Sequence, residues 1–364
     1  MSGLFIYVIL SIRTVYTNNR KNLKSGNRQF RCSAERPLAL IRQCPVYEPT
    51  PLLENSELRR AADVSRLWIK NEAKRMGLGS FKALGGAYAI AQMILDKCNE
   101  SDPFCERAQT TASEITFITA SAGNHGLSVA AGARVFGSKA VIVLSETVPE
   151  GFANRIRQMG AEVVRTVGSY EDSVDYAIKT ADDNNWLLLA DGSWEGYTER
   201  PALIMEGYTV LAEECRVEFD RIDDWPDHVF LQAGVGGLAA SVAAHIREFW
   251  AVQPKIIVVE PEAAPCLLRS VEAGVLIRAE GPVSNMGRLD CKDASLITFD
   301  SLKDDADGFQ LISEQEAEDA ANLCGQYGLP TTPSGAAGVA ALLKIKPDNH
   351  SRCLVIVSEG PEEG

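Results

Sequence analysis

The stretch Ser80-Phe81-Lys82-Ala83-Leu84-Gly85-Gly86-Ala87-Tyr88 places a lysine where a loop passes into an apolar helix, which we expect over residues 87–95. Backbone N–H groups at a helix start attract anions. A lysine amine in this position, once desolvated or flanked by a cation, loses its proton more readily and becomes a candidate for a Schiff base. Taken alone, the stretch is more typical of a solvated surface lysine, and only the other motifs of the chain favour the Schiff-base lysine.

The composition is that of an ordinary globular protein and sets limits on its partners. The chain has 364 residues, of which 46% are hydrophobic and 23% charged, enough for two domains that share an interface. Its formal net charge is −13. Bulk charge of this sign argues against binding to nucleic acid or to an anionic membrane.

The cysteines and histidines favour a cytoplasmic protein without a catalytic metal. The nine cysteines form no CxxC pair, and an odd number in a long chain is not typical of a secreted disulfide framework. We therefore expect reduced thiols. The four histidines are not spaced as metal ligands on a helix, which predicts no catalytic metal.

The N-terminal segment leaves two interpretations open. Residues 4–10 form an apolar run too short to span a bilayer, and no basic region precedes it, so a signal peptide is disfavoured. Residues 1–34 contain no acidic residue, as in a transit peptide. The alternation of Ile6, Val8 and Leu10 favours instead an edge strand in a wrapping arm.

Beyond residue 45 the chain alternates between apolar strand patterns and amphipathic helix patterns. Residues 45–52 are expected to be extended because of their prolines, and residues 98–109 read as an irregular loop. The expected strands are 67–70, 117–119, 140–144, 162–167, 186–190, 229–232, 256–259 and 354–357, and the expected helices are 127–136, 150–159, 170–182, 198–215 and 239–250. β-Branched runs separated by helices predict an α/β fold with parallel sheets covered on both faces.

Four loops that follow predicted strands carry the candidate functional residues. Ligands of open α/β sheets bind at the carboxyl ends of the strands, so these loops are expected to converge. The lysine loop is the first. The second, Ser121-Ala122-Gly123-Asn124-His125-Gly126, offers backbone that a ligand can approach closely and an amide donor on Asn124. A plain strand-to-helix turn is the alternative.

The third loop is Gly234-Val235-Gly236-Gly237-Leu238, which lies between a predicted strand and a predicted helix. Its glycines suit an anion cradle for a phosphate. The loop matches neither a dinucleotide GxGxxG pattern nor a Walker loop. The fourth loop, Ser358-Glu359-Gly360, presents a hydroxyl that either faces a ring nitrogen of a ligand or simply caps a helix.

A lysine amine, a phosphate cradle, an amide donor and a hydroxyl are together the groups needed to hold pyridoxal phosphate. In this order, the four loops resemble those of the fold type II, or tryptophan-synthase-β-like, pyridoxal-phosphate enzymes, over residues 45–360. The resemblance implies two parallel-sheet domains with helices on both faces. Residues 1–87 and 186–364 would form the larger, cofactor-binding domain, and residues 88–185 a smaller inserted domain.

Within this superfamily the chain most resembles diaminopropionate ammonia-lyases. The stretches that carry the resemblance are Tyr47–Leu52, Ser80–Ile90, Asp191-Gly192-Ser193-Trp194-Glu195-Gly196-Tyr197, Met205-Glu206-Gly207-Tyr208 and the pair Cys266 and Cys291. Threonine dehydratases share the lysine and glycine loops but are less similar around Trp194. The two cysteines occupy positions where the relatives carry cysteines able to pair, although a cytosolic setting favours free thiols.

The resemblance implies a role for each loop. Lys82 would form the Schiff base with the cofactor, and Asn124 would bind the phenolate oxygen. The phosphate would lie on the cradle formed by Gly234, Val235, Gly236, Gly237 and Leu238. Ser358 would meet the pyridine nitrogen, and a hydroxyl there does not force that nitrogen to protonate, which suits β-elimination better than transamination.

The implied reaction removes a proton from the α-carbon of an amino acid and expels a β-amino group, and yields pyruvate and ammonia. Lys82 and Asp191 are the two candidates for the base. For Asp191 the alternative is an ordinary turn aspartate at a strand end. Relatives usually carry aspartate where this chain has Ala122, and that carboxylate is linked to action on the D-isomer. Alanine cannot move a proton, so we expect a preference for an L-substrate.

The sequence and its resemblance thus predict a cytoplasmic ammonia-lyase that uses pyridoxal phosphate and acts on a small amino acid, and the resemblance implies a homodimer. Three alternatives stay open: a serine/threonine dehydratase, a β-replacement synthase and a non-catalytic carrier of the cofactor. The intact Lys82 argues against the carrier, and the run Trp194–Tyr197 argues against the dehydratase.

Overall fold

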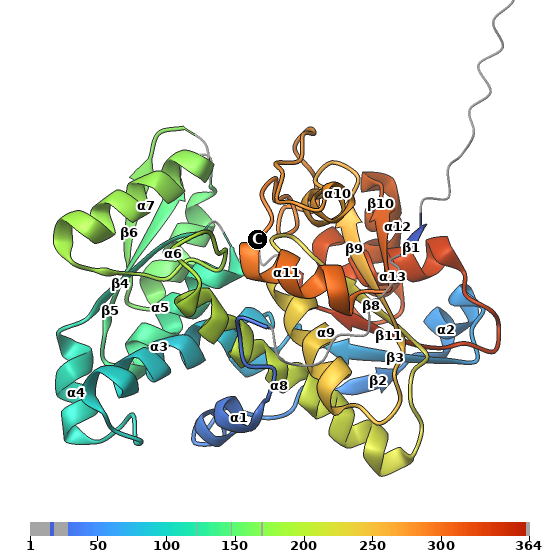
Figure 1. Cartoon of the computed structure of the whole chain (residues 1–364), viewed down its shortest axis with the longest axis horizontal. Coiled ribbons are helices and arrows are strands. Elements are labelled where there is room, and N and C mark those ends of the chain that lie inside the picture. The colour runs from blue at the N-terminus through green and yellow to red at the C-terminus, as the bar shows by residue number, and fades with distance from the viewer. Residues whose placement is uncertain (1–14, 18–27, 122, 147, 169, 362–364) are drawn as a thin grey trace, which may run out of the picture.

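The computed structural model describes residues 15–17, 28–121, 123–146, 148–168 and 170–361. The strand pattern expected at residues 6–10 and the side chain of Ala122 lie outside these described residues. The chain forms two lobes that lie side by side, each built around its own sheet (Figure 1).

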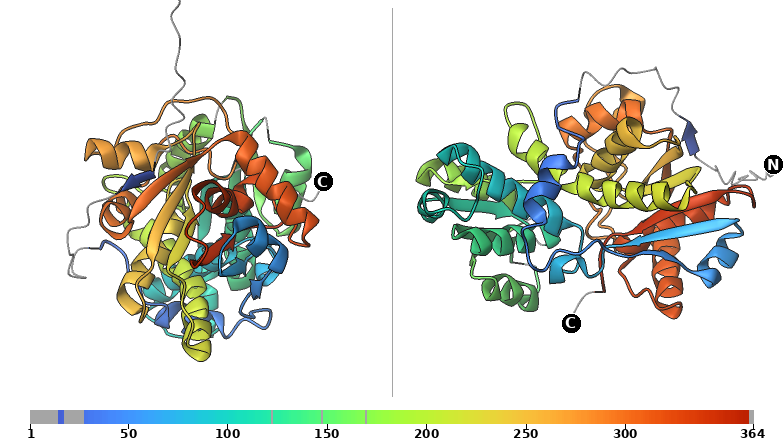
Figure 2. Two further views of the ribbon diagram at one scale, coloured as in Figure 1. Left: turned by 90° about the vertical axis from the view of Figure 1, so that its right-hand side faces the viewer. Right: turned by 90° about the horizontal axis from the view of Figure 1, so that it is seen from below.

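The larger lobe contains a seven-stranded sheet with the order β1-β10-β9-β8-β11-β3-β2. Its five central strands are parallel: β10 (Gly308–Ile312), β9 (Lys255–Pro261), β8 (His228–Gln232), β11 (Arg352–Val357) and β3 (Arg66–Asn71). Antiparallel strands close both edges, β1 (Val15–Thr17) and β2 (Leu52–Glu54). Figure 2 shows β1 at the edge of this lobe that is remote from the smaller lobe.

Helices cover both faces of this sheet. Two separate apolar clusters flank it, one that includes α8 (Glu199–Ile222) and α9 (Gly237–Phe249), and one that includes α12 (Glu314–Gln326) and α13 (Pro333–Ile345). The other helices of this lobe are α1 (Glu35–Ile41), α2 (Ser56–Ala62), α10 (Cys266–Ala273) and α11 (Leu296–Asp305). In the described part of the chain, no helix is both long and apolar enough to cross a membrane.

The smaller lobe contains a four-stranded parallel sheet. Its order is β6 (Glu162–Thr166), β5 (Lys139–Ser145), β4 (Thr116–Ala120) and β7 (Leu187–Leu188). Its helices are α4 (Glu106–Ser113), α5 (Asn124–Phe136), α6 (Glu150–Gln158) and α7 (Tyr170–Asn184). Phe117 packs in the same cluster as α5 and α6, whereas Ile118 packs with α7, as the alternation of side chains along a strand requires.

The predicted fold class is therefore confirmed, with two parallel-rich sheets covered on both faces. The proposed division at residues 88 and 185 stays a prediction. Strand β7, at Leu187–Leu188, hydrogen-bonds within the sheet of the smaller lobe.

Helix α3 (Lys82–Cys98) joins the two lobes, because it packs on α5 on one side and on α8 on the other. Figure 1 shows α8 beginning between the lobes and ending beneath the larger one. At the crossing of α3 and α8 a Cβ on Gly85 would stand 2.4 Å from the ring of Tyr208. Since real Cβ atoms do not approach so closely, the glycine allows this contact.

Four parts of the chain differ from the expectation. Helix α4 occupies part of the segment 98–109 that was predicted to be a loop. The sequence did not reveal this helix because its only buried residues, Ala108 and Ala112, give no strong apolar pattern. Residues 45–46 form a turn. Helix α8 continues to Ile222, where Cys215 and Phe219 extend its buried face by one further turn. Strand β10, which the sequence did not predict, pairs with β9.

Candidate active site

Lys82 is the first residue of α3, and its side chain points to Asp191. The Lys82 Nζ lies 2.5 Å from Asp191 Oδ2, and the two side chains are 20% and 21% exposed. The amine also lies 5.4 Å from the centre of the Phe81 ring and 5.6 Å from that of Tyr208. A carboxylate and two aromatic rings therefore surround the amine, which supports a functional rather than a solvated lysine.

The ion pair fixes the charges of both residues. Burial by itself would lower the pKa of Lys82, but the Asp191 carboxylate outweighs burial and raises that pKa. Burial would raise the pKa of Asp191, and the Lys82 ammonium instead holds it well below its usual range. The expectation that this amine loses its proton more readily is therefore wrong while Asp191 faces it.

Asp191 follows β7, and its loop is fastened to the larger lobe. The Ser193 N–H donates to Ser295 Oγ at 2.9 Å, and the Ile297 N–H at the start of α11 donates to Ser193 Oγ at 3.0 Å. Further along the loop, the Trp194 and Tyr197 rings stack at 4.4 Å. Asp191, the predicted acid–base residue, thus precedes a loop that is held in place by hydrogen bonds and by ring stacking.

The glycine loop lies between β8 and α9 and contacts the same start of α11. Gly236 has a φ of +103°, and a Cβ there would stand 2.7 Å from Thr298 Oγ1, so glycine is required. The Val235 carbonyl accepts from Thr298 Oγ1 at 2.6 Å and from the Ser295 N–H at 3.2 Å. The loop therefore opens α9 in a fixed conformation that no residue with a side chain reproduces.

Tyr208 connects the lysine to the glycine loop. Its ring faces the Lys82 amine, and its Cε2 lies 3.4 Å from the position of a Cβ on Gly237. Burial raises the pKa of the Tyr208 hydroxyl to about 12, so it is a neutral phenol at physiological pH. The hydroxyl forms no well-formed hydrogen bond with the described residues. A buried polar atom of this kind is expected to have a partner, which fits a ligand site.

The lysine loop and the C-terminal loop are paired through their backbones. The Phe81 N–H donates to the Ser358 carbonyl at 3.2 Å, and the Gly360 N–H donates to the Gly79 carbonyl at 2.9 Å. Ser358 is 5% exposed and follows the last residue of β11. The predicted partner of a ring nitrogen therefore lies on a segment adjacent to Lys82.

The loop that carries Asn124 comes from the smaller lobe and meets the C-terminal loop across the site. The Asn124 amide donates to Glu359 Oε2, and the Thr332 hydroxyl donates to Glu359 Oε1. Arg288 Nε lies 3.8 Å from Glu359 Oε2, and the Arg288 Cδ lies 3.1 Å from the position of a Cβ on Gly123. The four predicted loops thus converge at one place.

Four side chains near the site did not emerge from the sequence: His125, Tyr208, Arg288 and Glu359. His125 is buried, and its Nε2–H donates to the Leu189 carbonyl at 2.7 Å. Burial lowers the pKa of His125, which is therefore neutral. His125, Tyr208 and Glu359 lie inside motifs that the sequence analysis singled out, but the sequence does not indicate their contacts. Arg288 lies in no recognisable motif.

Cys266 and Cys291 both lie close to Gly234, and both are free thiols in the structure. The Cys266 Sγ donates to the Gly234 carbonyl at 3.6 Å, and the Cys291 Sγ lies 2.9 Å from the position of a Cβ on Gly234. Burial raises the pKa of Cys291 to about 12, so this thiol is unreactive.

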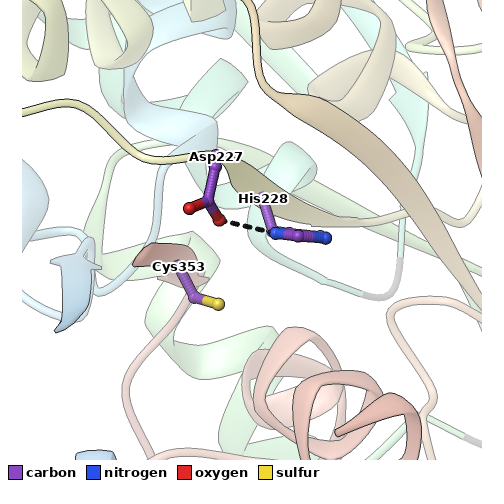
Figure 3. Close-up of side chains that lie close together, drawn as sticks. All are labelled: Asp227, His228 and Cys353. Carbon is purple, nitrogen blue, oxygen red and sulfur yellow. Dashed lines mark hydrogen bonds and ion pairs between the residues drawn. The ribbon is translucent and has the colours of Figure 1, made fainter. Parts of the chain in front are cut away.

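A separate cluster of possible metal ligands, Asp227, His228 and Cys353, lies at the opposite, amino-terminal end of the parallel strands (Figure 3). Both Asp227 oxygens accept from the Arg352 N–H at 3.0 Å, and Asp227 Oδ1 lies 2.6 Å from His228 Nδ1. Two ligands of one tetrahedral zinc ion stand roughly 3.3 Å apart given metal–ligand bonds of about 2.0 Å. The Asp227–His228 contact is therefore a hydrogen bond.

The site has the parts that pyridoxal phosphate requires. The glycine loop at the start of α9 is an anion cradle, and the Lys82 amine is partly exposed beside it. Tyr208 contacts both, which places the amine and the cradle around one space. The residues present therefore fit this cofactor.

Comparison with known proteins agrees with this fit. The sequence profile of the family described as "Pyridoxal-phosphate dependent enzyme" matches residues 44–359. The chain belongs to this family.

Individual relatives indicate which enzymes of this family the chain resembles. The chain is 33% identical over 309 residues to the diaminopropionate ammonia-lyase of Escherichia coli K12, and the match covers 82% of this chain and 78% of the relative. It is 29% identical to a biosynthetic L-threonine dehydratase of Haemophilus influenzae, across 84% of this chain and 55% of that protein.

The solved structures point the same way. A crystal structure of holo diaminopropionate ammonia-lyase from Escherichia coli superimposes with a TM-score of 0.86 at 29% identity, and covers 95% of this chain and 93% of that one. The protein is thus a pyridoxal-phosphate enzyme of the group that comprises the diaminopropionate ammonia-lyases and the dehydratases.

Proposed function

We propose that the protein eliminates ammonia from L-2,3-diaminopropionate and so converts one substrate and one water into pyruvate and two ammonia. The observation that carries the proposal is the contact of 2.5 Å between Lys82 Nζ and Asp191 Oδ2, an amine and a carboxylate able to exchange a proton. The similarity to diaminopropionate ammonia-lyases supports the choice of substrate.

The bound cofactor supplies an electron sink for negative charge at the α-carbon of the substrate. Lys82 would hold the cofactor through its side-chain amine. The Lys82 amine or the Asp191 carboxylate would accept the α-proton of the substrate. Lys82 and Asp191 would then share this proton, and the pair could pass it on before the next substrate binds.

Three further groups hold the cofactor in place. The N–H groups of Gly234, Val235, Gly236, Gly237 and Leu238 would bind its phosphate at the positive end of α9. Asn124 would donate to its phenolate oxygen. Ser358 would meet its ring nitrogen with a hydroxyl, which would leave the electron sink weaker than a carboxylate would and so favour elimination.

The preference for the L-isomer rests on Ala122. Relatives usually carry at this position an aspartate that is linked to action on the D-isomer, and a methyl group takes no part in proton transfer. Asp191 and Lys82 serve the other isomer. We propose further that the enzyme is a homodimer located in the cytoplasm, with a smaller domain at residues 88–185.

A serine/threonine dehydratase is the second candidate, because threonine and D-serine dehydratases also match much of the chain. A dehydratase releases one ammonia per keto acid, whereas diaminopropionate gives two. A β-replacement synthase would release pyruvate only slowly and would need a second nucleophile.

A substrate panel decides between these functions. Pyruvate and ammonia are measured from L- and D-diaminopropionate, L- and D-serine and L-threonine, with Lys82→Ala as the inactive control. Two ammonia per pyruvate from the L-isomer of diaminopropionate supports the proposal. Turnover of serine or threonine without turnover of diaminopropionate identifies a dehydratase, and equal rates on both isomers of diaminopropionate contradict the role given to Ala122.

A further inference from the structure

We propose that Tyr208 is a further cofactor-binding residue, whose hydroxyl donates a hydrogen bond to the phosphate of pyridoxal phosphate. This role depends on the cofactor and not on the substrate, so a failure of the proposed elimination reaction would leave it intact. It follows from the place where the Tyr208 ring is held, from the lack of an acceptor for its hydroxyl, and from the neutral charge of that hydroxyl.

The Tyr208 ring is held between the first turns of two helices. Its Cε1 lies 2.4 Å from the position of a Cβ on Gly85 of α3, and its Cε2 lies 3.4 Å from that of a Cβ on Gly237 of α9. The Phe81 ring packs edge-on against it, with 4.9 Å between the ring centres. Cε1 and Cε2 are the two neighbours of the carbon that carries the hydroxyl. The hydroxyl end of the ring therefore lies between the start of α3, which is Lys82, and the start of α9, which belongs to the glycine loop.

The hydroxyl of Tyr208 has no acceptor in the described part of the chain. Tyr208 is 1% exposed, and none of the described residues forms a well-formed hydrogen bond with its hydroxyl. Burial raises the pKa of the phenol, and the nearby Lys82 ammonium opposes that rise. An ammonium has no lone pair and so cannot accept the O–H hydrogen. The Asp191 carboxylate also acts on this pKa, but it is paired with Lys82.

A buried donor without an acceptor is destabilising, and native structures rarely keep one. The hydroxyl of Tyr208 is therefore expected to find its acceptor on a ligand. Among the groups of the cofactor, the phosphate fits this position. The glycine loop, residues 234–238, would hold the phosphate at the start of α9, and the Tyr208 ring contacts Gly237 within that loop.

The other two polar atoms of the cofactor ring are expected elsewhere, the phenolate oxygen at Asn124 and the ring nitrogen at Ser358. A phosphate oxygen also carries negative charge. A hydrogen bond from Tyr208 to it would be charge-assisted and stronger than one between two neutral groups.

The neutral charge of the hydroxyl suits a place beside Lys82. Burial raises the pKa of Tyr208 to about 12, so the hydroxyl keeps its hydrogen at physiological pH. A lysine or arginine at this place would also bind a phosphate, but its charge would compete with Lys82 for the Asp191 carboxylate. A phenol donates to the phosphate and leaves that ion pair without a competitor.

The test measures binding of the cofactor to Tyr208→Phe, which keeps the ring and removes only the hydroxyl. Cofactor-free, full-length protein is titrated with pyridoxal phosphate and, separately, with pyridoxal, which would attach to the same lysine but has no phosphate. We expect the Kd for pyridoxal phosphate to rise about 10-fold or more, the order for a lost hydrogen bond to a charged group, while the Kd for pyridoxal stays nearly the same. An equal rise for both ligands shows that the hydroxyl acts on Lys82 alone, and no rise for either shows that it does not bind the cofactor. Both of these results overturn the proposal.

Tyr88→Phe is the matched control. Tyr88 of α3 is 3% exposed, and its hydroxyl likewise forms no well-formed hydrogen bond with the described residues. Burial and then the Glu206 carboxylate raise the pKa of Tyr88, so the hydroxyl lies near a carboxylate. This variant should leave the Kd for pyridoxal phosphate unchanged. A rise equal to that of Tyr208→Phe would show that loss of any buried hydroxyl on these helices weakens binding, which overturns the specific role of Tyr208.

Thermal unfolding provides a second, independent readout. In the cofactor-free protein the Tyr208 hydroxyl lacks an acceptor, so Tyr208→Phe should not lower the Tm. Added pyridoxal phosphate should raise the Tm of the variant less than that of the unmutated protein, because tighter binding stabilises the folded state more. A Tm that falls by the same amount with and without the cofactor shows a role in packing alone and overturns the proposal.

Discussion

Gly207 of α8 lies directly against Gly85 of α3. A Cβ on Gly207 would stand 2.5 Å from the Leu84 carbonyl oxygen and 2.9 Å from the Gly85 Cα. The helix that begins with Lys82 is thus placed by a contact between two backbones, which leaves no side chain between them to adjust.

We therefore expect Gly207→Ala to displace α3 and weaken the protein. The methyl group meets backbone atoms, which cannot rotate away, so the cost should be at least about 1–3 kcal/mol, as for overpacked cores. Chemical denaturation measures this free energy of unfolding. Gly325→Ala on α12, where nothing lies within 4 Å of the added Cβ, is the matched control and should be neutral or stabilising.

Lys82→Ala should abolish covalent attachment of the cofactor and elimination together. The variant removes the one amine that faces Asp191. It should remain folded, because it loses an ion pair that is partly exposed and contributes about 1 kcal/mol. Absorbance of the bound cofactor in the visible range and a pyruvate assay report the two losses. Retained attachment would show that another lysine carries the cofactor.

Asp191→Asn should shift the pH at which the cofactor attaches to Lys82. Attachment needs the neutral amine, and Asp191 raises the pKa of Lys82, so in the unmutated protein attachment increases as the pH rises. Without the carboxylate, burial is left to lower that pKa, and the midpoint should move to lower pH. A titration of the visible absorbance from pH 6 to 10 measures the shift, and an unchanged midpoint would contradict the ion pair.

The same ion pair has an effect on stability with a definite sign. The folded pKa of Asp191 lies below its unfolded value, so its contribution is present above the unfolded pKa and is lost as the pH falls through the folded one. Lys82, whose pKa is raised, loses its contribution only in strong alkali. In the cofactor-free protein, Asp191→Asn should therefore lower the Tm at neutral pH and matter less below about pH 3.

Thr298→Val should weaken binding of the cofactor with little change in the fold. The Thr298 hydroxyl donates to the Val235 carbonyl and so fixes the glycine loop. Valine keeps the shape and removes this hydrogen bond, which contributes about 1 kcal/mol. We expect a roughly five-fold higher Kd for pyridoxal phosphate, from fluorescence titration of the cofactor-free protein. Thr298→Ser, which keeps the hydroxyl, should bind normally.

Much of the fold and of the site could be predicted from the sequence, because their signals are local. The strands at Leu67–Lys70 and Val229–Gln232 each begin with three consecutive apolar residues. The positive φ of Gly236 is likewise expected from the residue type, because glycine adopts this conformation without strain. Because each of the four loops follows a predicted strand, the sequence also predicted that all four lie at the carboxyl ends of strands.

What the sequence did not predict depends on contacts between distant segments. The pairing of Lys82 with Asp191 joins residues 109 positions apart, and it reverses the expected change in the pKa of the lysine. The charge of Glu359 is visible in the sequence, but its neighbour Arg288 lies 71 positions away. No periodic pattern encodes such a meeting.

The start of α11 touches two functional loops at once. Ser295 receives a hydrogen bond from Ser193 and gives one to Val235, so it bonds both to the segment that follows Asp191, the proposed acid–base residue, and to the glycine loop, the proposed phosphate cradle. One short piece of chain thereby serves as a common reference point for two parts of the reaction. A substitution at Ser295 would displace both loops together. New substrate preferences are therefore expected to evolve through residues that contact only one of the two loops.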